Sequence, residues 1–190
     1  PNALYAGCFF TVCAVQLISL LFLVGLKIPK PEVKSGPGRP IGVFLRMPVF
    51  VVGMLSSAIG YGLMSYMMTA TPLQIVNVVK LGTSANATII QWHVVAMFAP
   101  SFITGSLITR FGASRILWAG LLAYIATVVT ALNANSFWPY WWALTLVGIG
   151  WNFLYIGGSS LIATVALPEE RGRVQGFADL VLTSTVAASS

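Results

Sequence analysis

The sequence predicts an all-α membrane protein, built as a polytopic bundle of transmembrane helices. Of its 190 residues, 57% are hydrophobic and only 7% are charged, whereas soluble domains carry about 25% charged residues. A spanning helix needs about 20 mostly apolar residues. Five runs fit this requirement, and a sixth begins near Gly176 and reaches the last residue. The five are 3–26, 48–71, 88–108, 116–134 and 139–167. We therefore expect five complete spans and a truncated sixth, in a fragment of a longer protein.

The first run contains Cys8 and Cys13 and a single amide, Gln16. Two residues five positions apart on a helix point about 140° away from each other. The two thiols therefore predict neither a disulfide nor a metal site, and we expect no cofactor.

Residues 27–46 form the longest connection. It carries five basic residues against one acid, Glu32, together with four prolines. Prolines keep such a segment extended, and nothing in it predicts a core. We expect a flexible basic linker at 27–46, between a first helix at 1–26 and a helix bundle at 47–190.

The other connections are shorter. Residues 70–87 hold one charge, Lys80, and Pro72 predicts the end of the second helix. Residues 133–138 hold no charge, and Pro139 suits the first turn of the helix that follows. Residues 168–176, with the sequence PEERGRVQG, form a charged loop before the last run.

The basic residues predict the orientation in the membrane. If every run spans, nine of them lie on one side, in the linker, at Arg110 and Arg115, and at Arg171 and Arg173, and only Lys80 lies on the other. Cytoplasmic loops carry the excess of Lys and Arg. We expect the linker and both arginine-bearing loops in the cytoplasm. The basic residues that give the net charge of +6 lie between the apolar runs. They therefore indicate loops beside a lipid bilayer, which is the expected partner, and not a nucleic-acid-binding surface.

The stretch 105–115, GSLITRFGASR, joins the third and fourth runs. Gly105 allows close approach of a neighbouring backbone, and Gly112 allows a tight turn. The spacing of Gly105, Leu107, Arg110 and Gly112 resembles the loop signature G-x-L-x-x-R-x-G of the major facilitator superfamily. Thr109 stands where that family usually has Asp. The segment Pro-Glu-Glu-Arg-Gly-Arg at 168–173 resembles the family's connection between helices 10 and 11.

The resemblance implies the C-terminal half of such a transporter, from helix 6 to part of helix 11. It implies a secondary transporter that moves a small solute or drug-like molecule, efflux included, by alternating access with coupling to a proton or another ion. The partner would be a missing N-terminal six-helix half, in a multi-pass protein of the bacterial inner membrane. The alternative is a polytopic membrane protein without transport activity, either an intramembrane enzyme or a packing or receptor module. We expect no catalytic site, because the runs hold one histidine and no deep acid.

The fifth run suggests a substrate cavity. Thr145, Asn152 and Tyr155 lie on one polar stripe of the predicted helix. Polar groups within spans tend to mark transport pathways, and we expect Asn152 and Tyr155 to line the cavity. The other interpretation is helix packing, in which Asn152 bonds a neighbouring helix.

Two further runs offer cavity residues. Tyr61 and Met64 lie near the middle of the second run, and Gln91 and His93 lie in the third. His93 would titrate or bind substrate. The other interpretation is a neutral histidine that bonds another helix.

The only acid next to the last run is Asp179. We expect it in the first turn of that helix, where the helix dipole favours an acid. We also expect a cytoplasmic gate, in which Asp179 pairs with Arg110 or Arg115 of the loop motif, beside Gly105 and Gly112.

Overall fold

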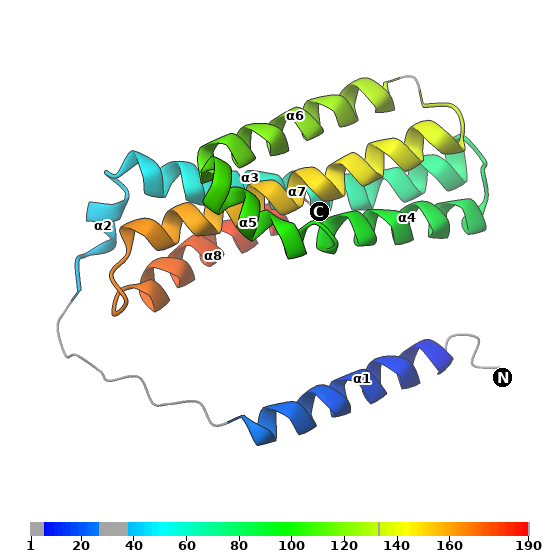
Figure 1. Ribbon diagram of the computed structural model, residues 1–190. Coiled ribbons are helices and arrows are strands. Elements are labelled where there is room, and N and C mark those ends of the chain that lie inside the picture. Colours follow the sequence, from blue (N-terminus) through cyan, green and yellow to red (C-terminus); the bar gives the residue numbers. More distant parts are fainter. Residues whose placement is uncertain (1–5, 27–37, 133, 190) are drawn as a thin grey trace. The chain divides into compact units, whose positions relative to one another are not determined.

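The computed structural model describes residues 6–26, 38–132 and 134–189, and the described chain consists of helices and their connections (Figure 1). It separates into two units, 1–35 and 36–190. In the first unit, α1 (Ala6–Gly25) is one apolar helix of 20 residues. Its two cysteines are free and exposed.

The second unit is a helical bundle centred on its longest helix, α7 (Phe137–Val165). The helices α3 (Pro48–Leu73), α4 (Thr83–Phe98) and α6 (Ala113–Ala131) pack against α7, and α8 (Arg171–Ser189) packs mainly against α3. The shorter elements are α2 (Ile41–Phe44), the π-helical turn η1 (Gln74–Val78) and α5 (Ser101–Phe111).

Four helical segments in the described chain are long and apolar enough to cross a membrane: α1, α3 with η1, α6 and α7. The pair α4 and α5 makes a fifth span if it is counted as one helix bent by 41°. The predicted all-α membrane bundle is therefore confirmed.

Glycines explain how closely α7 approaches its neighbours. A Cβ atom on Gly53 of α3 would lie 2.7 Å from the Gly158 carbonyl oxygen of α7, and one on Gly148 would lie 2.7 Å from the His93 carbonyl oxygen of α4. Helices in a bilayer associate through such small residues, which bring the backbones into van der Waals contact.

The prediction that the second span ends at Pro72 is wrong. The helix continues through Pro72 to Leu73, and η1 extends it to Val78. Proline lacks the N–H that the helix ladder needs, and the wider π turn that follows is closed by the Val79 N–H, which donates to the Gln74 carbonyl at 2.9 Å. The connection that contains Lys80 is correspondingly short.

The second part of the predicted flexible linker is docked on the bundle. Residues 27–37 lie outside the described residues. Phe44, in α2, is fully buried and its ring centroid lies 5.8 Å from that of Phe50 in α3. The linker therefore contributes to a core cluster at this end of the bundle, which its proline content concealed.

Candidate functional site

A pocket of about 400 Å³ opens between α3, α7 and α8. Ligand pockets usually enclose 300–1,000 Å³. The lining residues are Tyr61, Tyr155, Asp179, Leu182, Thr183 and Val186. Two of the predicted cavity residues, Tyr61 and Tyr155, thus line the same pocket as Asp179, which the sequence predicts at the gate.

An aromatic cluster backs this pocket. Trp151 and Tyr155 lie one helical turn apart on α7, and their rings stack at 5.3 Å with an interplanar angle of 7°. The Tyr61 ring meets both edge-on, at 5.4 and 5.9 Å. Phe98, at the end of α4, meets Trp151 edge-on at 5.9 Å. These are the separations at which aromatic pairs attract one another. Of this cluster, Tyr61 and Tyr155 line the pocket, and together with Trp151, which stacks on Tyr155, they form what we call the aromatic wall.

Asp179 lies further from the start of its helix than the sequence suggested. Because α8 begins at Arg171 and not near Gly176, Asp179 is in the third turn of the helix. It lies roughly 12 Å along the helix axis from Arg171, at about 1.5 Å per residue. The interpretation of Asp179 as a first-turn acid is therefore wrong.

The predicted ion pair between Asp179 and the loop arginines is not formed in this structure. The Asp179 Oδ1 atom accepts a hydrogen bond from Gln175 Nε2 at 2.9 Å, one turn earlier on the same helix. The guanidinium of Arg110 lies over the Phe111 ring, and Arg115 donates to the Phe111 carbonyl at 3.4 Å. The physical reason is position: Asp179 is an exposed residue in the third turn of α8, where it lines the pocket, whereas both arginines lie at a helix end.

Asn152 does not line the pocket. Its side chain is fully buried and makes three hydrogen bonds. Its amide nitrogen donates to the Met97 carbonyl at 2.7 Å and to Ser101 Oγ at 2.6 Å, and its Oδ1 accepts from Thr104 Oγ1 at 2.6 Å. All three partners surround the bend between α4 and α5. Pro100, at this bend, has no N–H and interrupts the helix ladder. Asn152 therefore holds the bend against α7.

His93 is also buried between helices. Its Nδ1 atom lies 2.8 Å from the Leu144 carbonyl of α7, so it carries the proton and donates. Its Nε2 atom is buried without a partner. The bond joins α4 to α7, in agreement with the packing interpretation, and His93 is 1% exposed.

The remaining predicted cavity residues lie elsewhere. Thr145 donates to the Trp141 carbonyl of its own helix at 2.7 Å. Met64 is buried in a core cluster with Trp151. Gln91 is exposed and lines a separate hollow along α4.

The loop motif forms the predicted tight turn between α5 and α6. Gly112 has φ of 85°, a left-handed conformation that glycine adopts without strain. Gly105 differs from the expectation, because an added Cβ would meet no atom within 4 Å. No described helix approaches it closely in this structure.

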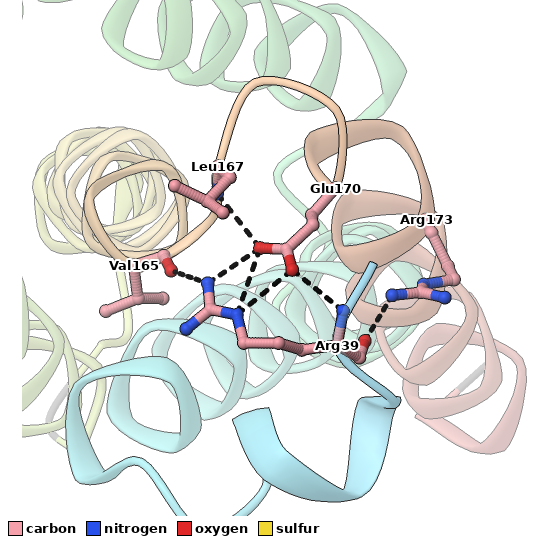
Figure 2. Close-up of polar contacts among 5 residues, drawn as sticks. All are labelled: Arg39, Val165, Leu167, Glu170 and Arg173. Atoms are coloured by element: carbon pink, nitrogen blue, oxygen red, sulfur yellow. Dashed lines mark hydrogen bonds and ion pairs between the residues drawn. The ribbon is translucent and has the colours of Figure 1, made fainter. Parts of the chain in front are cut away.

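Sequence reasoning missed a clamp at the end of the bundle where α7 ends and α8 begins (Figure 2). Glu170, whose side chain is 1% exposed, forms an ion pair with Arg39 at 2.6 Å. Arg39 Nε also donates to the same carboxylate, and Arg39 Nη2 donates to the Val165 carbonyl at 2.9 Å. Arg173 donates to the Arg39 carbonyl. The clamp ties the end of the linker to the connection between α7 and α8.

The clamp has a defined pH dependence. Hydrogen bonds from Arg39 lower the pKa of Glu170 to about 2, and the same bonds raise the pKa of Arg39. The pKa of Glu170 in the folded protein lies below its ordinary value. The ionised carboxylate therefore adds its full contribution to the free energy of unfolding above about pH 4.5, and this contribution is lost as the pH falls toward 2.

We expect Glu170→Gln to lower the melting temperature of the purified full-length protein at pH 7. The difference from the unmodified protein should shrink as the pH falls from about 4.5 toward 2, because the carboxyl becomes protonated over this range and is then neutral like the amide. Glu169→Gln, at the exposed neighbouring position, is the matched control and should leave the melting curves unchanged. A pH-independent difference for Glu170→Gln would contradict the clamp.

Comparison with known proteins agrees with this architecture. The model of the Major Facilitator Superfamily matches residues 3–190. The riboflavin transporter RfnT of Brucella anthropi is 40% identical over 196 residues, covering 100% of this chain and 48% of that protein. The uncharacterized MFS-type transporter YddS of Bacillus subtilis is 30% identical over 200 residues, covering 96% of this chain and 44% of that protein. The chain spans about half the length of the curated relatives that it matches over its whole length. It belongs to the major facilitator superfamily, as the loop motif predicted, and is an integral, multi-pass membrane protein.

Proposed function

We propose that the full-length protein is a secondary transporter of a planar aromatic solute of the riboflavin type, which binds at the pocket between α3, α7 and α8. The observation that carries this proposal is the aromatic wall, in which Trp151 and Tyr155 stack and Tyr61 closes on their edges. A relative that covers the whole chain at 40% identity is named a riboflavin transporter.

The chemistry of the wall suits such a solute. Riboflavin combines a flat tricyclic ring with a chain of hydroxyl groups. A flat ring gains both buried apolar area and favourable ring contacts against Tyr61 and Tyr155. The carboxylate of Asp179 and the hydroxyl of Thr183, on the α8 side of the same pocket, offer hydrogen bonds to hydroxyl groups.

The depth of the pocket suits alternating access. Tyr155 lies ten residues before the end of α7, or roughly 15 Å along the helix at about 1.5 Å per residue. Transporter substrate sites lie near the middle of the bilayer, at the interface between the two halves of the protein. The other half of the site would come from helices outside this chain.

Asp179 is the candidate for coupling to a proton. Of the acids that the structure describes, Glu169 and Glu170 lie in the connection before α8, and Asp179 alone lies within a helix and lines the pocket. Ionisable side chains at membrane depth are costly and tend to be functional. We propose that Asp179 binds and releases the coupling proton during transport across a bacterial inner membrane.

The proposal is tested by flavin transport. The full-length gene would be expressed in bacteria that require riboflavin and lack their own uptake system, and labelled riboflavin would be followed in both directions, into cells and out of preloaded cells. We expect labelled riboflavin to move in one of these two directions, and we expect no transport of an aliphatic amino acid in either direction. Folded protein in the membrane that moves riboflavin in neither direction would contradict it.

A further inference from the structure

The walls of the solute pocket that come from α7 and α8 are held together mainly by contacts outside the pocket. Tyr155 belongs to α7, and Asp179, Leu182, Thr183 and Val186 belong to α8. Helix α8 packs mainly against α3 and touches α7 little. The separation of these two walls therefore depends on α3 and on the connection that joins the end of α7 to the start of α8.

Arg39 bridges this connection (Figure 2). Its Nη2 atom donates to the carbonyl of Val165, the last residue of α7, at 2.9 Å. The same guanidinium donates to the Glu170 carboxylate from Nε at 3.0 Å and from Nη2 at 2.6 Å. Arg173, in the first turn of α8, donates to the Arg39 carbonyl. One residue of the linker is thus bonded to the end of one pocket helix and to the start of the other.

The clamp fits closely around Glu170. Its carboxylate also accepts from the backbone N–H of Arg39 at 2.9 Å and from that of Leu167 at 3.1 Å. A Cβ atom on Gly38 would lie 2.8 Å from Glu170 Cγ and 3.2 Å from Arg173 Nη2. Charge-assisted bonds from a guanidinium fork fix orientation as well as distance. The clamp therefore sets the geometry of the corner between α7 and α8.

The same part of the linker holds α8 further along. Phe44 is fully buried and belongs to one core cluster with Ala178 of α8. The Arg39 guanidinium lies over the Phe44 ring, 4.6 Å from its centroid. Ala178 directly precedes Asp179. Residues 38–44 thus support the part of α8 that leads into the pocket.

A displacement at the clamp is carried along α8 into the pocket. Asp179 lies nine residues after Glu170, or roughly 13 Å at about 1.5 Å per residue, so a tilt of about 10° at the clamp moves it by roughly 2 Å. The groups of a binding site need to be held to within about 0.5 Å of their productive geometry. The pocket is therefore sensitive to the clamp.

We propose that Arg39 is a positioning residue for the solute pocket, which sets the separation between Tyr155 of α7 and Asp179 of α8 through the clamp. The linker segment 38–44 then supports the binding site as well as the fold. This inference rests on the proposed binding of the solute at this pocket.

Spin labels test the positioning without any solute. In a full-length protein whose native cysteines have been replaced, labels would be attached at Val129→Cys on α6, which packs on α7, and at Leu180→Cys on α8; both positions are exposed. Arg39→Gln should shift or broaden the distance distribution by about 2 Å or more, the displacement that a tilt of α8 produces. Arg171→Gln changes an exposed arginine at the start of α8 and should leave the distribution unchanged. An unchanged distribution in Arg39→Gln would overturn the proposal, whatever the solute is.

The dissociation constant of riboflavin, measured per folded molecule, tests the effect on the site. Arg39→Gln should weaken binding by about three- to tenfold, less than the full loss of a hydrogen bond to a charged group, because α3 still holds α8. Arg39→Lys should restore part of the affinity, because it keeps the charge but lacks the fork that reaches Glu170 and Val165 together.

A purely structural role of Arg39 predicts a different result. The yield and the melting temperature would fall while the dissociation constant stayed unchanged, and this outcome would overturn the proposal even if the label distance shifted. If the unmodified protein binds no riboflavin, the proposed solute is wrong, and the label distance alone then decides whether Arg39 positions α8.

Discussion

Asp179→Asn is expected to abolish the accumulation of solute against its gradient in the full-length protein. The amide keeps the size of the carboxyl and can still accept from Gln175, as Asp179 does at 2.9 Å, but it cannot carry a proton. Coupled uptake should fall at least about tenfold, the factor that corresponds to about 1.4 kcal/mol. Exchange of labelled for unlabelled solute across the membrane needs no net proton movement and should persist.

The comparison of uptake with exchange separates coupling from folding. Asp179→Glu should retain part of the coupled uptake, because it keeps an acid in the pocket. Glu169→Gln, an acid in the exposed connection before α8, should retain all of it. If Asp179→Asn still accumulates solute at the normal rate and to the normal level, Asp179 is not the coupling group.

Asn152→Leu is expected to destabilise the bundle and not to change the choice of solute. The substitution removes three hydrogen bonds at the bend between α4 and α5 and leaves the Met97 carbonyl and the Thr104 hydroxyl buried without this partner. Each buried group left without a partner costs about 1–3 kcal/mol, although bonds between membrane helices average nearer to about 0.6 kcal/mol. We expect a loss of about 2–4 kcal/mol, seen as a lower yield of folded protein.

Thr145→Val is the matched control for Asn152→Leu. Thr145 lies two turns earlier on α7 and bonds only its own helix, at the Trp141 carbonyl, so its replacement should leave the yield unchanged. Transport per folded molecule should also be unchanged in both variants. Normal yield with altered solute selectivity for Asn152→Leu would restore the cavity role that the sequence suggested.

The positions of the helices could be predicted from the sequence, but the contacts between the helices could not. Hydropathy placed the spans because each needs its own apolar length in a bilayer. The role of Asn152 depends on a bend in another helix at Pro100, and a polar stripe alone cannot distinguish a cavity from such a contact. The position of Asp179 was misjudged because α8 begins at Arg171, within a charged segment that hydropathy assigns to a loop.

Contacts between distant segments explain the other differences. Arg39 and Glu170 are separated by 131 positions along the chain, and neither carries a local signal for the other. The prolines around Arg39 indicated an extended segment, which is compatible with docking as well as with flexibility. Tyr61 and Tyr155 were predicted as cavity residues, but Trp151, which stacks on Tyr155, was overlooked because tryptophan is also common at helix ends in membranes.

The central claim is that the aromatic wall binds the transported solute, and direct binding tests it. Riboflavin would be titrated with the purified full-length protein, and the quenching of flavin fluorescence would give the dissociation constant. Tyr155→Leu removes a stacked ring and should weaken binding by about 1–2 kcal/mol, or roughly 5- to 30-fold. Tyr66→Leu, which changes an exposed tyrosine of α3 outside the pocket, should leave the affinity unchanged. An unaltered affinity in Tyr155→Leu would contradict the account.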